Sequence, residues 1–75
     1  MKNTKIIFFH EKIKKNNAIF DIKYLKNNNK FIVEKTVQKT VRKNTILSTE
    51  NFIFDNPEDG YREFTKIINF INSKN

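Results

Sequence analysis

The spacing of apolar residues changes along this chain, and this change constrains the fold more than any other feature. Within residues 18–37, apolar side chains recur at every second position, which is the period of a β-strand with one buried face. From Tyr61 onward they recur at every third or fourth position, which is the period of an amphipathic helix. Strands followed by a helix predict an α+β fold in which the helix packs on one face of a sheet.

Clusters of asparagine and lysine divide the first part of the chain into segments of strand length. Asn tolerates the left-handed backbone conformation, so the clusters at 14–17 and 27–30 predict turns. They bound predicted strands at 5–13, 18–25 and 30–37, of which the last two form a hairpin. The continuous apolar block at 6–9 predicts that the first strand is covered on both faces.

Residues 38–54 give less definite predictions. Residues 40–47 combine the end of one strand with the start of another, and the bend is expected at Arg42, Lys43 and Asn44. Residues 48–51 resemble a turn, and residues 52–54 form either a short strand or an apolar clamp under the helix. The sequence therefore predicts a four-stranded antiparallel meander within residues 5–54.

A helix is predicted for about 57–72. Asp55 or Asn56 can cap it, and Pro57 suits its first position. Glu58 and Asp59 place negative charge near the positive end of the helix dipole. The apolar stripe consists of Tyr61, Phe64, Ile67, Ile68 and Ile71. With 75 residues in all, the chain is expected to form a single domain.

Scarce residue types exclude several classes of function. The chain has no Cys, one His and one Gly, which excludes a disulfide framework, a zinc ligand set and a glycine-rich phosphate loop. His10 has no predicted partner that would make it a general base, and Ser48 and Ser73 lack the context of a catalytic triad. We therefore expect a protein that is not an enzyme, with no catalytic residues, no metal site and no cofactor.

The sequence contains no predicted membrane span or export signal. Its longest apolar run covers only residues 6–9, whereas a span needs about 20 apolar residues. The basic start of the chain is followed by this short block and then by His10, Glu11 and Lys12, without a cleavage site. We expect a cytoplasmic protein that does not associate with membranes.

Positive charge is concentrated in the predicted sheet. The net charge of +7 divides into +9 for residues 1–49 and −2 for residues 50–75. One explanation is that the sheet binds the phosphate backbone of nucleic acid. An equally weighted explanation is solubility combined with the codon usage of an AT-rich genome, because lysine also opposes aggregation at sheet edges. Attraction to an acidic protein or to a membrane surface is the remaining and least weighted explanation of the charge.

The candidate binding residues lie on the predicted sheet and its turns. Phe8 and Phe9 are neighbours on a strand and are expected on opposite faces, so one is either a stacking platform on the open face or covered by a dimer partner. Ile19, Leu25 and Ile32 on the face opposite the helix predict homodimerisation. The candidate nucleic-acid-binding residues are Lys23, Lys35, Lys39, Arg42, Lys43 and Phe9.

Two segments resemble a known family. Residues 18–23 (AIFDIK) and 30–35 (KFIVEK) resemble the hairpin of bacterial PUR-repeat proteins, and the stripe at 64–71 is similar to their C-terminal helix. The order of elements also resembles that of PC4-like and Whirly single-stranded-DNA binders. This resemblance implies an intertwined homodimer that holds single-stranded nucleic acid on curved sheets, with Lys23 and Lys35 as contacts. The glycines and arginines common in the turns of those proteins are absent here.

The leading hypothesis is a small basic protein that binds single-stranded DNA or RNA, in preference to duplex, through an open basic sheet face and with little sequence specificity. The alternative is a protein-interaction module, such as a phage or accessory protein, that docks on a partner through the open face or an edge of the sheet.

Overall fold

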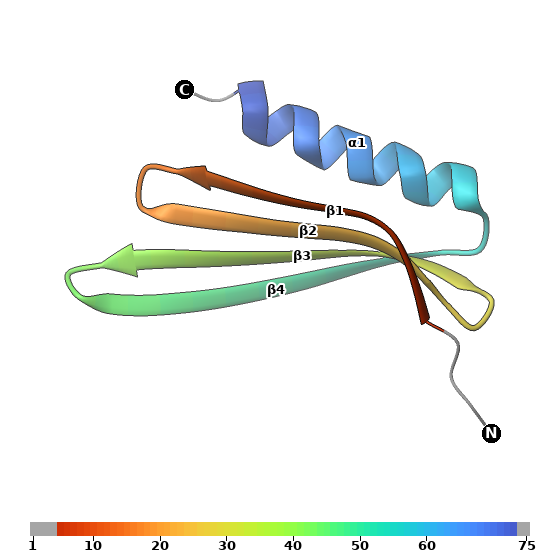
Figure 1. Ribbon diagram of the computed structural model, residues 1–75, viewed down its shortest axis with the longest axis horizontal. Coiled ribbons are helices and arrows are strands. Elements are labelled where there is room, and N and C mark those ends of the chain that lie inside the picture. Colours follow the sequence, from red (N-terminus) through yellow and green to blue (C-terminus); the bar gives the residue numbers. More distant parts are fainter. Residues whose placement is uncertain (1–4, 74–75) are drawn as a thin grey trace.

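The computed structural model describes residues 5–73, which form one antiparallel sheet and one helix (Figure 1). The strands lie in chain order within the sheet, and the helix packs on one of its faces. The elements are β1 (Lys5–Lys15), β2 (Ala18–Asn27), β3 (Lys30–Val41), β4 (Asn44–Phe54) and α1 (Pro57–Ser73). The predicted α+β meander with a C-terminal helix is confirmed.

The hydrophobic core lies between α1 and the central strands. Ile22 and Val33 are completely buried, and they pack against Phe64 of the helix. Ile22 in β2 and Val33 in β3 belong to the sets of every-second residue that point to the same face of the sheet. The period-two pattern of the sequence therefore correctly identifies the face that the helix covers. Burying two such aliphatic side chains contributes about 3–6 kcal/mol relative to leaving them exposed.

The strands are longer than the sequence pattern predicts. The segment 48–51, which resembles a turn in the sequence, lies inside β4, where Thr49 is opposite Thr36 and Glu50 is opposite Lys35. Hydrogen bonding to β3 satisfies the backbone of this polar segment and outweighs its weak strand preference. The predicted bend is confirmed, because Arg42 and Lys43 form the turn between β3 and β4.

β1 is an edge strand, so the prediction that it is covered on both faces is wrong. The side chains of residues 6–9 are between 42% and 50% exposed. The helix lies against β2, β3 and β4, and β1 has only β2 as a neighbour in the sheet. A continuous apolar block therefore occurs here without burial, because the period of a short run does not report its environment.

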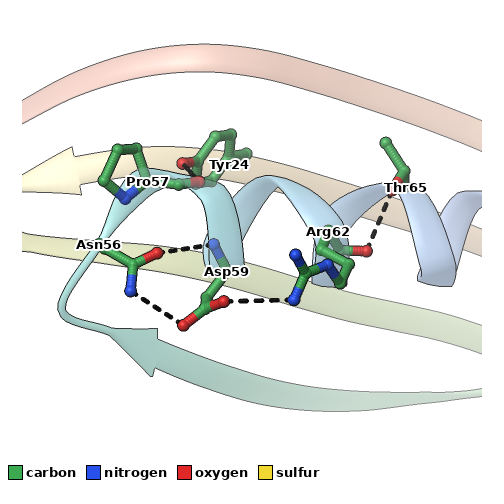
Figure 2. A network of polar contacts seen from close by, with 6 residues as sticks. All are labelled: Tyr24, Asn56, Pro57, Asp59, Arg62 and Thr65. Carbon is green, nitrogen blue, oxygen red and sulfur yellow. Dashed lines mark hydrogen bonds and ion pairs between the residues drawn. The ribbon is translucent and has the colours of Figure 1, made fainter.

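Asn56 is the residue that caps α1 (Figure 2). Its Oδ1 accepts a hydrogen bond of 2.9 Å from the backbone nitrogen of Asp59, and its Nδ2 donates to the Asp59 carboxylate, also at 2.9 Å. This satisfies one of the free N–H groups of the first turn. Asp55, the other predicted cap, instead pairs with Lys30, and this ammonium group lowers the pKa of the Asp55 carboxyl.

Tyr24 fixes the start of the helix to the sheet. Its hydroxyl donates a hydrogen bond of 2.6 Å to the carbonyl oxygen of Pro57, and burial raises the pKa of this phenol (Figure 2). Gly60 lies directly over the ring, since a Cβ at this position would be only 2.6 Å from Tyr24 Cε1. The single glycine of the chain thus permits a close approach of helix and sheet.

Candidate nucleic-acid interface

The helix is too short to cover the sheet along its whole length. At about 3.4 Å per residue the 12 residues of β3 extend about 40 Å, whereas at about 1.5 Å per residue the 17 residues of α1 extend about 25 Å. In Figure 1 the turn between β3 and β4 lies beyond the C-terminal end of α1 along the long axis of the molecule. Every residue from 38 to 51 is exposed. We call residues 38–49 the hairpin tip.

The hairpin tip carries Lys39, Arg42 and Lys43 and contains no acidic residue. In the part of the chain that the structure describes, none of these three side chains has a carboxylate within 4.0 Å. The other predicted cations differ. The Nζ atom of Lys35 lies 3.7 Å from Oε1 of Glu50, and Lys23 is directly opposite Glu34 in the sheet. Among the predicted binding cations, the three at the tip are therefore the ones whose charge no nearby carboxylate compensates.

The backbone of the tip turn is unusual for its sequence. Arg42 and Lys43 both have positive φ, at 49° and 71°, as a two-residue turn of type I′ requires. For residues other than Gly, Asn and Asp this conformation costs about 1–2 kcal/mol each. The turns between β1 and β2 and between β2 and β3 instead place Asn16 and Asn28 at the positive-φ position. The strained turn is thus the one that presents two cations.

The structure distributes the predicted binding residues over two faces of the sheet. Lys23 lies on the helix-free face, as expected. Lys35 is opposite Ile22 and Lys39 is opposite Ala18, so both belong to the face that carries the helix. The expectation of one open basic face that includes these lysines is wrong. What the structure brings together is Lys39, Arg42 and Lys43, at the end of the hairpin.

Phe9 does not lie on the open face, and neither does Phe8. A β-bulge between Ile7 and Phe9 inserts one extra residue, so the two adjacent rings do not alternate between the faces. The centroid of Phe8 is 5.3 Å from that of Tyr24, and the centroid of Phe9 is 5.7 Å from that of Phe64. Both rings are on the helix side. The prediction that they point to opposite faces is wrong, and no feature of the sequence marked the bulge.

The bulge creates an aromatic groove of about 520 Å³ between β1 and the start of α1. Its lining is apolar apart from Glu58 and contains no cation, so it does not suit a phosphate backbone. The lining residues are Phe8, Phe9, Tyr24, Pro57, Glu58 and Tyr61.

A second groove, of about 280 Å³, has the opposite character and was not predicted. It lies on the helix-free face at the base of the hairpin tip, where Lys14, Ile19 and Gln38 form one row across three strands. The turn residues Asn16 and Asn17 complete it together with Thr40. We call it the polar groove. The asparagine clusters in the sequence were its only signal, and turn formation already explained them.

An apolar row also crosses the helix-free face. Ile7, Leu25, Ile32 and Ile53 are successive partners from β1 to β4. Leu25 is 2% exposed, whereas Ile53 at the free edge is 63% exposed. The predicted position of Leu25 and Ile32 opposite the helix is confirmed, and there Leu25 is buried and Ile32 is partly buried.

Residues 5–73 contain no group of three or more His, Asp or Glu side chains placed to hold a metal ion. In the same range, no helix has the length and apolar character needed to cross a membrane. No protein-family model matches the chain, and no match exists among the curated proteins or the solved structures compared with it. The resemblance to PUR-repeat proteins therefore stays a prediction.

Proposed function

We propose that this protein binds nucleic acid through its hairpin tip, with a preference for single strands and little sequence specificity. The observation that carries the proposal is the projection of Lys39, Arg42 and Lys43 beyond the helix, without a carboxylate partner in residues 5–73. Cations in this state attract phosphate groups, and contacts with phosphate carry no sequence information.

The strained turn supports the same proposal. At two other turns of this chain the residue with positive φ is asparagine, which adopts this conformation at a lower free-energy cost. Asparagine is thus used where the turn requires only a particular backbone conformation. At the tip it keeps Arg42 and Lys43 in spite of a cost of about 1–2 kcal/mol each. Strain of this kind persists where the side chains serve a function, and two projecting cations are suited to bind phosphate.

Fluorescence anisotropy with labelled single-stranded and duplex oligonucleotides tests the proposal. We expect micromolar or tighter binding to the single strand at about 50 mM salt, and a steep loss of affinity at about 200 mM. Absence of binding to both forms at the lower salt concentration would refute the proposed function. Tighter binding to duplex would refute the preference for single strands alone.

A pair of variants with equal net charge locates the binding surface. The tip variant replaces Lys39, Arg42 and Lys43 by Gln, and the control variant replaces Lys5, Lys26 and Lys66 by Gln. Each phosphate contact on a single strand contributes about 0.7 to the slope of log K against log salt, so the tip variant should reduce that slope by about 2. The control variant should change it by much less. Equal effects would mean that net charge, and not the tip, attracts the nucleic acid.

A second candidate function is association with a protein, and the apolar row on the helix-free face favours a second copy of this chain as the partner. Ile7 and Ile53 remain half or more exposed at the two ends of this row, and burying such side chains favours association. Sedimentation equilibrium of the wild type and of Ile53→Lys tests it. We expect a dimer that the substitution dissociates, whereas a wild-type protein that is monomeric at high concentration would rule this candidate out.

A further inference from the structure

The polar groove at the base of the hairpin tip has the chemistry of a site for a nucleobase. It offers the carboxamides of Asn16, Asn17 and Gln38, which carry donors and acceptors side by side. Carboxamides of this kind pair with the edges of bases, most often with adenine. The hydroxyl of Thr40 adds one further polar group.

These polar groups are available to a ligand. In residues 5–73 no hydrogen bond from the side chains of Asn16, Asn17, Gln38 or Thr40 to another protein group is present. Elsewhere on the sheet polar side chains pair with each other, as Thr36 does with Thr49 at 3.4 Å. The groove thus gathers unused hydrogen-bonding capacity at one place.

The remaining lining residues suit the other parts of a nucleotide. Ile19 lies in the same row as Lys14 and Gln38 and offers an apolar surface for the face of a base. Lys14 has no carboxylate within 4.0 Å in the described part of the chain, so it is free to pair with a phosphate. At about 280 Å³ the groove is slightly smaller than the ~300–1,000 Å³ typical of small-molecule sites, which fits one base better than a larger ligand.

The position of the groove connects it to the basic tip. Thr40 at its rim precedes the turn residue Arg42 by two positions, a separation of at most about 7 Å. A nucleic acid held by the turn cations Arg42 and Lys43 is therefore close to the opening of the groove, whereas Lys39 lies on the opposite face of the sheet. Only an unpaired base is able to enter, since a base has to leave the stack before a groove on the protein surface takes it up, and paired bases stay stacked inside the duplex.

We propose that the polar groove binds one unpaired nucleobase of a single-stranded nucleic acid through its carboxamides, while Lys14 and Arg42 contact the phosphates on either side. This inference rests on the proposed function and adds to it the reason for a single-strand preference. It also makes the base, and not only the backbone, part of the recognition.

The test compares a base-bearing oligonucleotide with an abasic strand of the same length. Gln38→Ala should weaken binding of the base-bearing strand by about fivefold or more, the lower limit for a good base contact, and leave binding of the abasic strand unchanged. Asn51→Ala is the matched control, because Asn51 is an exposed residue of β4 that also carries a carboxamide. It lies on the same face of the sheet as Gln38 but outside the groove. Thermal unfolding confirms that both variants remain folded.

A spectroscopic measurement provides a second readout that needs no substitution. The side-chain amide NMR signals of Asn16, Asn17 and Gln38 should shift on addition of the base-bearing strand and stay in place with the abasic strand. Equal binding of both strands by the wild type, or equal effects of Gln38→Ala and Asn51→Ala, would overturn the inference while the proposed function stands. If neither strand binds, the proposed function fails and the inference fails with it.

Discussion

The two ends of the β3–β4 hairpin differ in almost every physical respect. Near Val33 the strands lie under the helix, Val33 is completely buried, Phe52 is partly buried against the core, and the neighbouring turn uses Asn28 at positive φ. At the hairpin tip the same two strands continue without cover, and the turn places Arg42 and Lys43 at positive φ. The end near Val33 contributes buried side chains to the core, whereas the hairpin tip exposes cations to solvent in a strained backbone conformation.

This difference shows that strand continuity and core formation are separate properties in this protein. Backbone pairing holds the tip in the sheet up to the Val41–Asn44 pair, although no residue from 38 to 51 is buried. The ladder therefore extends beyond the core, and its end from Thr40 to Thr45 is a preformed two-stranded ribbon. A ligand that binds there meets an ordered surface and needs to order little of the chain on binding.

The largest predicted effect separates the two regions by stability. Ile22→Ala removes a completely buried side chain and should lower the free energy of unfolding by about 2–5 kcal/mol. Ile46→Ala makes the same change at a tip side chain that is 56% exposed, and the expected effect is about 0.5 kcal/mol or less. Urea unfolding measures both. Similar losses in the two variants would mean that the tip is part of the core.

The next effect concerns the close approach of helix and sheet. Gly60→Ala gains about 1 kcal/mol in helix propensity but places a Cβ 2.6 Å from Tyr24 Cε1. Because overpacking costs about 1–3 kcal/mol and the ring is 3% exposed, we expect a net loss of up to about 2 kcal/mol. Asn69→Ala, at an exposed position of the same helix, should instead be neutral or stabilising. A stabilised Gly60→Ala variant would show that this contact does not limit the packing.

A smaller effect is expected at the helix cap. Asn56→Ala removes the acceptor of the Asp59 backbone N–H and should lower the free energy of unfolding by about 1 kcal/mol. The matched change Asp55→Ala affects only an exposed ion pair and should cost much less. Thermal unfolding of the two variants measures the difference. An equal or larger loss of stability in Asp55→Ala would mean that Asn56 is not the residue that caps the helix.

The smallest effect is the pH dependence of the Asp55–Lys30 pair. Lys30 lowers the folded-state pKa of Asp55 below its unfolded-state value, so the pair stabilises the fold above the unfolded-state pKa. This contribution is lost as the pH falls through the lowered folded-state pKa. An NMR titration should place the Asp55 midpoint below the ordinary value of an Asp carboxyl in the wild type, and higher in Lys30→Gln. An unchanged midpoint in the variant would mean that the pair does not persist in solution.

Local sequence patterns were sufficient to predict the order of elements, the face of β2 and β3 that packs on the helix, and the bend at Arg42 and Lys43. They did not predict the overhang, because polar residues 48–51 join β4 only through pairing with β3. The sequence pattern did not predict the bulge at Phe8 either, because a prediction based on strict alternation of side chains assumes that no extra residue is inserted in the strand.

The candidate site was predicted only in part. The sequence singled out Lys39, Arg42 and Lys43 by their proximity along the chain, and the structure keeps them together at the tip. It placed Phe9 on the wrong face, and it gave no indication that the turn asparagines and Gln38 line one groove. Such a groove depends on the register of three strands, which a single strand pattern does not define.

The central claim is that the hairpin tip binds nucleic acid. Its most direct test replaces Arg42 and Lys43 by uncharged residues that adopt positive φ without strain. The double variant Arg42→Asn, Lys43→Gly has the preferred sequence of a type I′ turn. We predict that its free energy of unfolding rises by about 1–3 kcal/mol, while its affinity for single-stranded nucleic acid falls and its salt slope becomes shallower by about 1.4. A more stable variant that binds nucleic acid as tightly as the wild type, with the same salt slope, would contradict the claim that the tip is the binding surface.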